Sequence, residues 1–174
     1  MLPGCPLEVI GVVHTARTTP ATTPVQAALN RAEQGTVEIF EAFAQGLSGL
    51  EGFDYVWLLT WMPLASGSQE MPAMIQVPFL LRPQGRTMGV FATRGPQRVN
   101  PLGLSLVNLL EVSGRTLRFA GVDLVDGTAV VDLKPFVTRF DSPPEVPRCG
   151  WFDSVEMAEA VTPADLDPGL EGEP

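Results

Sequence analysis

Residues 104–136 read LSLVNLLEVSGRTLRFAGVDLVDGTAVVDLKPF, and this stretch decides the fold class. It contains three runs rich in aliphatic residues, Leu104–Val112, Leu117–Val122 and Val130–Phe136, bounded by Gly, Pro or Asp-Gly. Such runs between turn residues are typical of short β-strands. Seven short strands in all predict a mainly β protein, folded as an antiparallel barrel or sandwich. The other four runs are Val9–Val13, Thr36–Phe40, Tyr55–Met62 and Met88–Ala92.

We expect one or two short helices and long loops beside these strands. Glu41–Leu50 is the clearest helical segment, because Phe43, Leu47 and Leu50 would share one face. The connections over residues 14–35 and 63–87 are long, and loops of that length in a compact domain are usually functional or mobile.

The chain is long enough for one buried core, since it has 174 residues of which 45% are hydrophobic. We therefore expect a single domain over residues 1–152, followed by an acidic, flexible tail over 153–174. No apolar run approaches the roughly 20 residues of a membrane helix, which predicts a cytoplasmic protein without a membrane partner. Cys5 and Cys149 have no metal-ligand neighbours, which predicts reduced thiols and no metal site.

The formal net charge of −9 is concentrated near the end of the chain. Residues 141–174 contain nine acidic residues against Arg148 alone. Residues 71–110, by contrast, contain no Asp or Glu. Charge alone leaves two interpretations of this basic segment, a site for an anionic ligand or a set of solvated arginines. Its basic residues are Arg82, Arg86, Arg94 and Arg98.

Missing motifs exclude several enzyme classes. The sequence has no Gly-x-Gly-x-x-Gly turn, no phosphate-binding loop and no Gly-x-Ser-x-Gly elbow. A Rossmann enzyme needs the glycine-rich turn, and a serine hydrolase ordinarily needs a histidine beside its nucleophile. His14 is the only histidine, and we interpret it as a hydrogen-bonding residue that orders a loop rather than as a catalyst.

Two loops have features suited to ligand binding. Ala92–Gly103 contains two prolines and two glycines, which fix its path and either pre-organise a ligand site or stiffen a crossover. In Asp123–Thr128 the Asp-Gly pair predicts a β-hairpin, which by itself needs no ligand. However, Asp123, Asp126, Asp132 and Lys134 place four charged groups within twelve residues of an otherwise apolar strand pair.

Strand alternation places two further pairs of side chains on common faces. Asp132 and Lys134 would share one face, either as a mutual ion pair or with a carboxylate facing a cofactor. Trp57 and Trp61 would also share a face, and they belong either to the core or to an acceptor pocket.

The loops and their surroundings resemble the TrmO (YaeB, TsaA-like) family, methyltransferases that modify N6 of threonylcarbamoyladenosine beside the anticodon of certain tRNAs. The resemblance covers residues 7 to about 152, and its motifs occur in the family order. They are Ile10-Gly-Val-Val-His14, Thr23-Pro-Val-Gln26, Leu47–Leu64, Gly89-Val-Phe-Ala-Thr-Arg94, Arg98-Val-Asn-Pro-Leu-Gly-Leu-Ser105, Asp123-Leu-Val-Asp-Gly-Thr128 and Val131-Asp-Leu-Lys-Pro-Phe136.

The resemblance implies a small single-domain β-barrel that acts on tRNA as a homodimer, with S-adenosyl-L-methionine bound near the subunit boundary. Asp126 is the candidate catalytic base, and Asp132 is a weaker one. The residues expected to contact the oxyanions and other polar groups of the substrate are Arg82, Arg86, Arg98, Asn100 and Lys134. The cofactor contacts carried over are Gln26, Ala27, Ala28, Leu29, Pro63, Leu64, Arg94, Leu104, Asp126, Gly127, Thr128 and Ala129.

The sequence departs from the family pattern at three positions. Pro63 stands where the family often has a polar residue or His, Val99 stands for a proline, and Phe136 stands for a tyrosine. The additional C-terminal domain of many bacterial members is also expected to be absent. Two alternatives to tRNA methylation therefore stay open: methyl transfer to a small anionic acceptor, and cofactor binding without catalysis.

Overall fold

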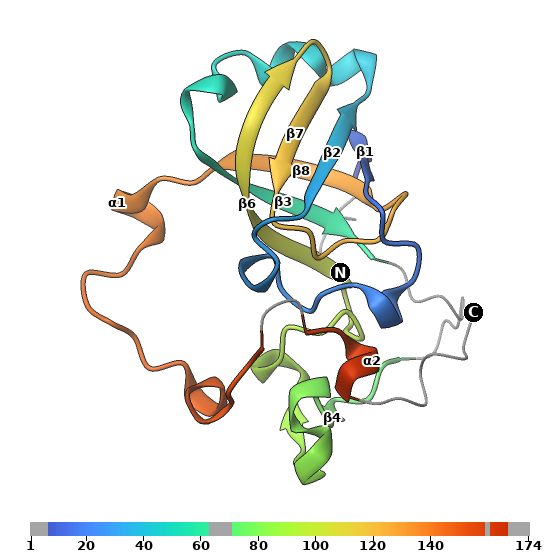
Figure 1. Ribbon diagram of the computed structural model, residues 1–174, viewed down its shortest axis with the longest axis vertical. Coiled ribbons are helices and arrows are strands. Elements are labelled where there is room, and N and C mark those ends of the chain that lie inside the picture. Colours follow the sequence, from blue (N-terminus) through green and yellow to red (C-terminus); the bar gives the residue numbers. More distant parts are fainter. Residues whose placement is uncertain (1–6, 63–70, 159–160, 167–174) are drawn as a thin grey trace, which may run out of the picture.

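The protein folds as a closed six-stranded antiparallel β-barrel, with a lobe of loops and short helices beneath it (Figure 1). This computed structural model describes residues 7–62, 71–158 and 161–166. The barrel strands follow the order β1-β2-β7-β6-β3-β8, and β8 closes onto β1. The barrel is thus confirmed, and the sandwich is excluded. The strands are Gly11–His14 (β1), Gln34–Ile39 (β2), Tyr55–Trp61 (β3), Leu102–Ser113 (β6), Thr116–Ala120 (β7) and Ala129–Pro135 (β8).

Alternate side chains of each barrel strand form the core. On β3, Val56, Leu58 and Thr60 are buried, whereas the residues between them are partly exposed. This period of two follows from the pleat of a strand. Phe119 of β7 is among the largest fully buried side chains. Removing this apolar interior from water is the main favourable term in the folding of the barrel.

The expected strand Met88–Ala92 is wrong in its extent and its place. β5 covers only Met88–Gly89, and it pairs with β4, Ile75–Gln76, in a separate two-stranded sheet. The chain then turns through a 3-10 helix, η6, at Val90–Ala92. The side chain and the backbone N–H of Thr93 both donate to the oxygen of Val90, so this turn, and not a strand ladder, satisfies the backbone there.

The predicted Asp-Gly hairpin is also wrong. β7 pairs with β2 and β6, and β8 pairs with β1 and β3, so the turn at Asp126-Gly127 joins strands that are not neighbours. The Gly127 N–H donates to Val13 on β1 at 2.9 Å, which directs the turn toward β1. The tight turn between β6 and β7 instead contains Gly114, whose φ of 60° favours glycine.

The segment predicted as a helix over Glu41–Leu50 consists of two 3-10 helices, η3 at Glu41–Leu47 and η4 at Leu50–Gly52. Gly49 between them has a φ of 86°, a left-handed conformation that ends the first helix. The apolar face was predicted correctly, because Leu47 is buried and Phe43 and Leu50 pack against the core.

The remaining short helices lie mostly in the lower lobe of Figure 1. Val161 of the acidic segment accepts a hydrogen bond from the Val25 N–H at 2.9 Å, and Val161 is buried. The domain boundary at residue 152 stays a prediction. In the described part of the chain, no helix is long and apolar enough to cross a membrane. The short helices are Pro20–Thr22 (η1), Ala27–Leu29 (η2), Phe79–Gln84 (η5), Thr138–Asp141 (α1), Gly150–Ser154 (η7) and Pro163–Leu166 (α2).

Thr60 provides a test of this packing. It is fully buried, and its Oγ1 has no hydrogen-bond partner among the described residues. Thr60→Val keeps the shape and removes the unsatisfied hydroxyl, so we expect the unfolding free energy to rise by about 1 kcal/mol in denaturant titrations. Thr93→Val is the matched control, because it removes a hydroxyl that is hydrogen-bonded and should lower stability. A less stable Thr60→Val protein contradicts the prediction.

Candidate functional site

Three of the segments assigned to the cofactor meet at one place. Gln26 precedes η2, and its Oε1 accepts a hydrogen bond from Arg94 Nε at 2.9 Å. Arg94 Nη2 also donates to the backbone oxygen of Leu104 on β6 at 3.4 Å. Arg94 is exposed, and Leu104 keeps 47% of its surface accessible. We call Gln26, Arg94 and Leu104 the Arg94 cluster, which combines an amide, a cation and an apolar surface.

A buried carboxylate lies beside this cluster. Asp123 Oδ2 accepts a hydrogen bond from the Ala27 N–H at 2.9 Å, which ties η2 to the segment between β7 and β8. Burial raises the pKa of the Asp123 carboxyl, while the Ser105 hydroxyl, the Ala27 N–H and the Arg94 guanidinium act in the opposite direction. In the sequence, Asp123 is the first residue of the Asp123–Thr128 motif, and no role was assigned to it. Its partner Ala27 is 96 residues away, so no local pattern could reveal the contact.

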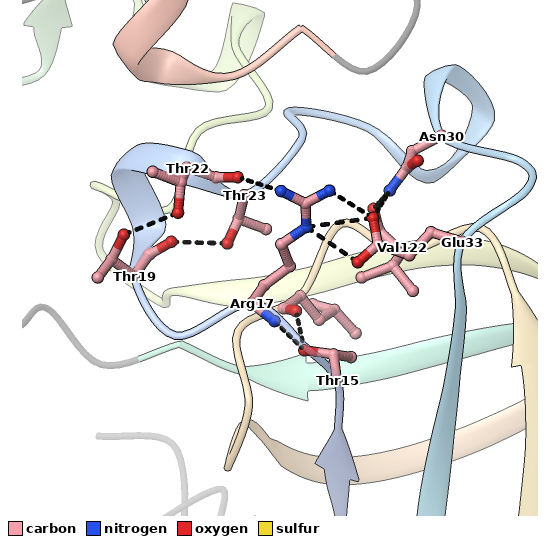
Figure 2. A network of polar contacts seen from close by, with 9 residues as sticks. Thr15, Arg17, Thr19, Thr22, Thr23, Asn30, Glu33 and Val122 are labelled. Carbon is pink, nitrogen blue, oxygen red and sulfur yellow. Dashed lines mark hydrogen bonds and ion pairs between the residues drawn. The ribbon is translucent and has the colours of Figure 1, made fainter. Parts of the chain in front are cut away.

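A network of polar contacts holds the loop between β1 and β2, which contains η2 (Figure 2). Arg17 donates to both carboxylate oxygens of Glu33, from Nε at 2.9 Å and from Nη2 at 2.5 Å. Its Nη1 donates to the backbone oxygen of Thr22 at 3.0 Å. Asn30 Nδ2 donates to Glu33 at 2.7 Å and to the oxygen of Val122 at 2.9 Å. The network therefore fixes the loop on both sides of η2, and it reaches the residue before Asp123.

Glu33→Gln is expected to lower the unfolding free energy at pH 7 by about 1–2 kcal/mol, because it weakens charge-assisted hydrogen bonds. The hydrogen bond from Arg17 lowers the pKa of the Glu33 carboxyl in the folded protein. Such a carboxyl stabilises the fold above its unfolded pKa of about 4.3, and this contribution is lost as the pH falls through the folded pKa. Denaturant titrations of both proteins should therefore converge once the pH has fallen below the lowered pKa of the folded Glu33 carboxyl. A difference that persists unchanged in acid contradicts the assignment.

The fourth described cofactor segment, Asp126–Ala129, lies at the start of β8. Asp126 Oδ1 accepts a hydrogen bond from the Thr15 N–H at 3.1 Å and lies 3.5 Å from His14 Nδ1. The Asp126 N–H donates to the backbone oxygen of Arg17 at 2.7 Å. His14 thus sits where it can order a loop, and the exposed Asp126 carboxylate is held in place by backbone contacts.

The outer face of β6, β3 and β8 joins this segment to the Arg94 cluster. Trp61 of β3 pairs with Leu102 of β6 on one side and with Ala129 of β8 on the other. Two residues earlier, Leu59 pairs with Leu104. Because residues two apart on a strand point to the same face, Ala129 and Leu104 share this outer surface.

The same surface shows where Trp57 and Trp61 lie and how Asp132 and Lys134 are paired. Trp57 and Trp61 alternate with the buried residues of β3, so they lie on the outer face, half-buried, and not in the barrel core. Trp57 contacts Phe136 edge-on, with ring centroids 6.2 Å apart. Lys134 pairs with Trp57 across the strands, and its Nζ lies 2.7 Å from Asp132 Oδ2. The mutual ion pair is therefore the arrangement present.

The residues assigned to the substrate are more dispersed. Arg98 Nη2 donates to two backbone oxygens of its own loop, at 3.2 and 3.4 Å, which braces the loop of Arg94. Arg82 on η5 lies over the ring of Phe79, 4.1 Å from its centroid. Arg86 and Asn100 are exposed. The assignment of these side chains to a substrate stays a prediction.

Pro63 and Leu64, which were also assigned to the cofactor, lie outside the described residues, as does Cys5. Cys149 is an exposed free thiol. Across the residues that the structure describes, no group of three His, Cys, Asp or Glu side chains is arranged to hold a metal ion.

Comparisons with known proteins agree on one family. Residues 12–142 match the family described as the tRNA-methyltransferase O N-terminal domain. A probable S-adenosyl-L-methionine-binding protein of Pyrococcus abyssi is 37% identical over 144 residues, which cover 83% of this chain and 74% of that protein. The tRNA (adenine(37)-N6)-methyltransferase of Mus musculus is 41% identical over 105 residues, 60% of this chain and 23% of that protein.

A solved structure shows the same architecture. The crystal structure of TrmO from Pseudomonas aeruginosa superposes with a TM-score of 0.67 at 31% identity, over 85% of this chain. The match covers 62% of the Pseudomonas chain, so this chain spans less than two thirds of that protein.

Proposed function

Because this chain belongs to the tRNA-methyltransferase O N-terminal domain family, we propose that it methylates tRNA with S-adenosyl-L-methionine as the methyl donor. The proposed acceptor is N6 of threonylcarbamoyladenosine beside the anticodon. The family resemblance of the sequence motifs supports this acceptor, as do relatives that are named tRNA (adenine(37)-N6)-methyltransferases.

The Arg94 cluster is the observation that carries the proposal. S-adenosylmethionine combines a carboxylate, cationic ammonium and sulfonium groups, and an aromatic adenine. A site for it needs a cation, an anion and an apolar surface. Arg94 and the exposed Leu104 supply the cation and the apolar surface, and the buried Asp123 adds negative charge that acts on Arg94. The residues present therefore fit the cofactor.

The chemistry divides between cofactor and protein. Bound S-adenosylmethionine supplies an already activated methyl group. The residues of this chain orient donor and acceptor and exclude water from between them. The acceptor N–H is conjugated with a carbonyl, so it is a weak nucleophile. A positioned base that accepts its proton contributes about 10²–10⁴ in rate. Asp126 is the proposed base, because its exposed carboxylate is held by the Thr15 N–H.

The basic segment is the proposed contact to RNA. Planar guanidinium groups bind phosphate and carboxylate oxygens in pairs, which suits Arg82, Arg86 and Arg98. Asn100 and Lys134 are proposed as further polar contacts to the substrate. The nine acidic residues of 141–174 would repel RNA. Part of this segment lies against the basic one, since Trp151 Nε1 donates to the Ala92 oxygen at 2.7 Å and α2 packs against η5. We therefore propose that tRNA approaches the basic segment from the face away from Trp151 and α2.

We propose that the protein works as a homodimer, through the outer face of β3 and β6. Exposed apolar side chains on these strands include Tyr55, Leu102 and Leu104, with 43%, 39% and 47% of their surfaces accessible. Apolar groups of this kind are typical of protein interfaces. Light scattering across a range of concentrations tests the dimer. A tRNA substrate also implies a cytoplasmic location.

Analysis of tRNA nucleosides by mass spectrometry tests the proposed reaction. Incubation of the purified protein with S-adenosylmethionine and tRNA containing threonylcarbamoyladenosine should produce the N6-methylated nucleoside, and Asp126→Asn should slow its formation by about 10²-fold or more. Binding to tRNA should weaken steeply with salt, because basic side chains release counterions from phosphate. Cofactor binding without any tRNA binding at low salt would contradict the tRNA substrate.

A second candidate is suggested by the concentrated negative charge of residues 141–174, which disfavours a polyanion. In this case the protein would methylate a small anionic acceptor. Transfer of labelled methyl groups to the small-molecule fraction of a cell extract, and not to its RNA, favours this candidate. Absence of transfer to either fraction, with cofactor binding intact, favours a protein that binds the cofactor without catalysis.

A further inference from the structure

We propose that Asp123 is a positioning residue of the cofactor site, which holds the η2 turn through the Ala27 N–H and orients Arg94 by its negative charge. The inference rests on the proposed binding of S-adenosylmethionine. It assigns a role to the first residue of the Asp123–Thr128 motif, which is not among the cofactor contacts carried over from the family.

Two features place Asp123 between the cofactor segments. Its Oδ2 holds the Ala27 N–H at 2.9 Å, one residue after Gln26. Its charge acts on Arg94, whose side chain joins Gln26 and Leu104. A single carboxylate therefore holds the turn that begins at Gln26, and its charge acts on the guanidinium that donates to Gln26.

The second carboxylate oxygen distinguishes this residue from an ordinary structural hydrogen-bond acceptor. Asp123 Oδ1 is buried and has no hydrogen-bond partner of good geometry among the described residues. A buried anion that lacks a full set of donors opposes folding. One acceptor oxygen, as in asparagine, would satisfy the Ala27 N–H without burying a charge. The Ala27 contact therefore does not require the charge, and the charge has a use if it orders the cation at the cofactor site.

The surrounding groups determine the pKa of the Asp123 carboxyl. Burial raises the pKa of its carboxyl, and Arg94, Ser105 and the Ala27 N–H partly offset this effect. On the adjoining loop, Glu33 is paired with Arg17, which lowers the pKa of Glu33. The other carboxylate on its own segment is Asp126, three residues later. The net effect of these groups leaves the pKa of Asp123 raised.

Asp123→Asn tests the proposal with two independent measurements. Isothermal titration calorimetry with S-adenosylmethionine should show about a tenfold weaker Kd, because the amide keeps the Ala27 contact but no longer attracts Arg94. Thermal unfolding without cofactor should show a Tm equal to or above that of the wild type. When folding raises the pKa of a carboxyl, the unfolding free energy of the protein decreases as the pH rises through that pKa. The amide does not ionise, so the variant avoids this decrease.

Two comparisons make the test specific. Glu111→Gln is the control, because Glu111 pairs with Arg118 on the β6–β7 hairpin and should leave the Kd unchanged. In an Arg94→Ala background, Asp123→Asn should weaken binding by much less than tenfold, since the two side chains act as a unit. If the effects of the two substitutions on the binding free energy are fully additive, Asp123 does not act through Arg94, and the proposal is overturned.

The pH dependence of binding provides a readout that a purely structural residue would not change. In the wild type, the affinity for S-adenosylmethionine should fall as the pH drops through the raised pKa of Asp123, and Asp123→Asn should remove this dependence. Wild-type protein that binds no cofactor refutes the proposed function itself. Wild-type binding together with an unchanged Kd in Asp123→Asn, or a large fall in its Tm, overturns the role of Asp123 alone.

Discussion

Replacing Arg94 with alanine is expected to weaken the binding of S-adenosylmethionine about 100-fold while leaving the barrel folded. Arg94 joins the two sides of the site, through Gln26 at 2.9 Å and the Leu104 oxygen at 3.4 Å. Its loss removes charge-assisted hydrogen bonds, and about 2.7 kcal/mol corresponds to a 100-fold change in Kd. Because Arg94 is exposed, the substitution buries no new polar group, and the Tm should change little.

Calorimetric titration with S-adenosylmethionine measures this effect, and two variants sharpen it. Arg94→Lys should fall between wild type and alanine, because an ammonium keeps the charge but cannot form the planar fork. Arg118→Ala removes an exposed arginine that pairs with Glu111 and should bind normally. Equal affinity in Arg94→Ala and wild type would mean that the cofactor lies elsewhere.

The barrel could be predicted from the sequence because its strands have local signals. Six of the seven expected strands correspond to barrel strands, with ends shifted by at most two residues. The errors concern features that local patterns do not determine. The Asp126-Gly127 turn has the composition of a hairpin, yet hydrogen bonds from the turn to Arg17 and Val13 direct it to β1. The segment from Glu41 has an apolar face at helical spacing, but Gly49 interrupts it.

The candidate site was predictable in part, through the family motifs. They identified Gln26, Arg94 and Leu104, which the structure brings into contact. They did not identify Asp123 as the support of the η2 turn, nor the Arg17–Glu33 pair that holds the same loop. These contacts join residues that are distant in the sequence or lie in a loop without periodicity. Only the closed barrel and its hydrogen bonds reveal them.

Gly103→Ala is expected to lower the unfolding free energy by about 1–3 kcal/mol and to weaken cofactor binding as well. Gly103 on β6 pairs with Thr60 on β3, where the strands pass close together. A Cβ at this position would collide with Thr60 Oγ1 and would lie 2.9 Å from Met62 Cε. A shift of β6 that relieves the collision would displace the neighbouring Leu104 and its contact to Arg94. Denaturant titration and calorimetry measure the two losses.

Two variants separate this collision from a general effect of replacing glycine. Gly46→Ala should be neutral or slightly stabilising, because a Cβ there meets nothing within 4 Å. Combining Gly103→Ala with Thr60→Ala removes the Oγ1 that obstructs the new methyl group. The double variant should therefore be more stable than the sum of the two single effects, since the substitutions are in contact. Strict additivity would show that the close approach of β3 and β6 does not cause the loss.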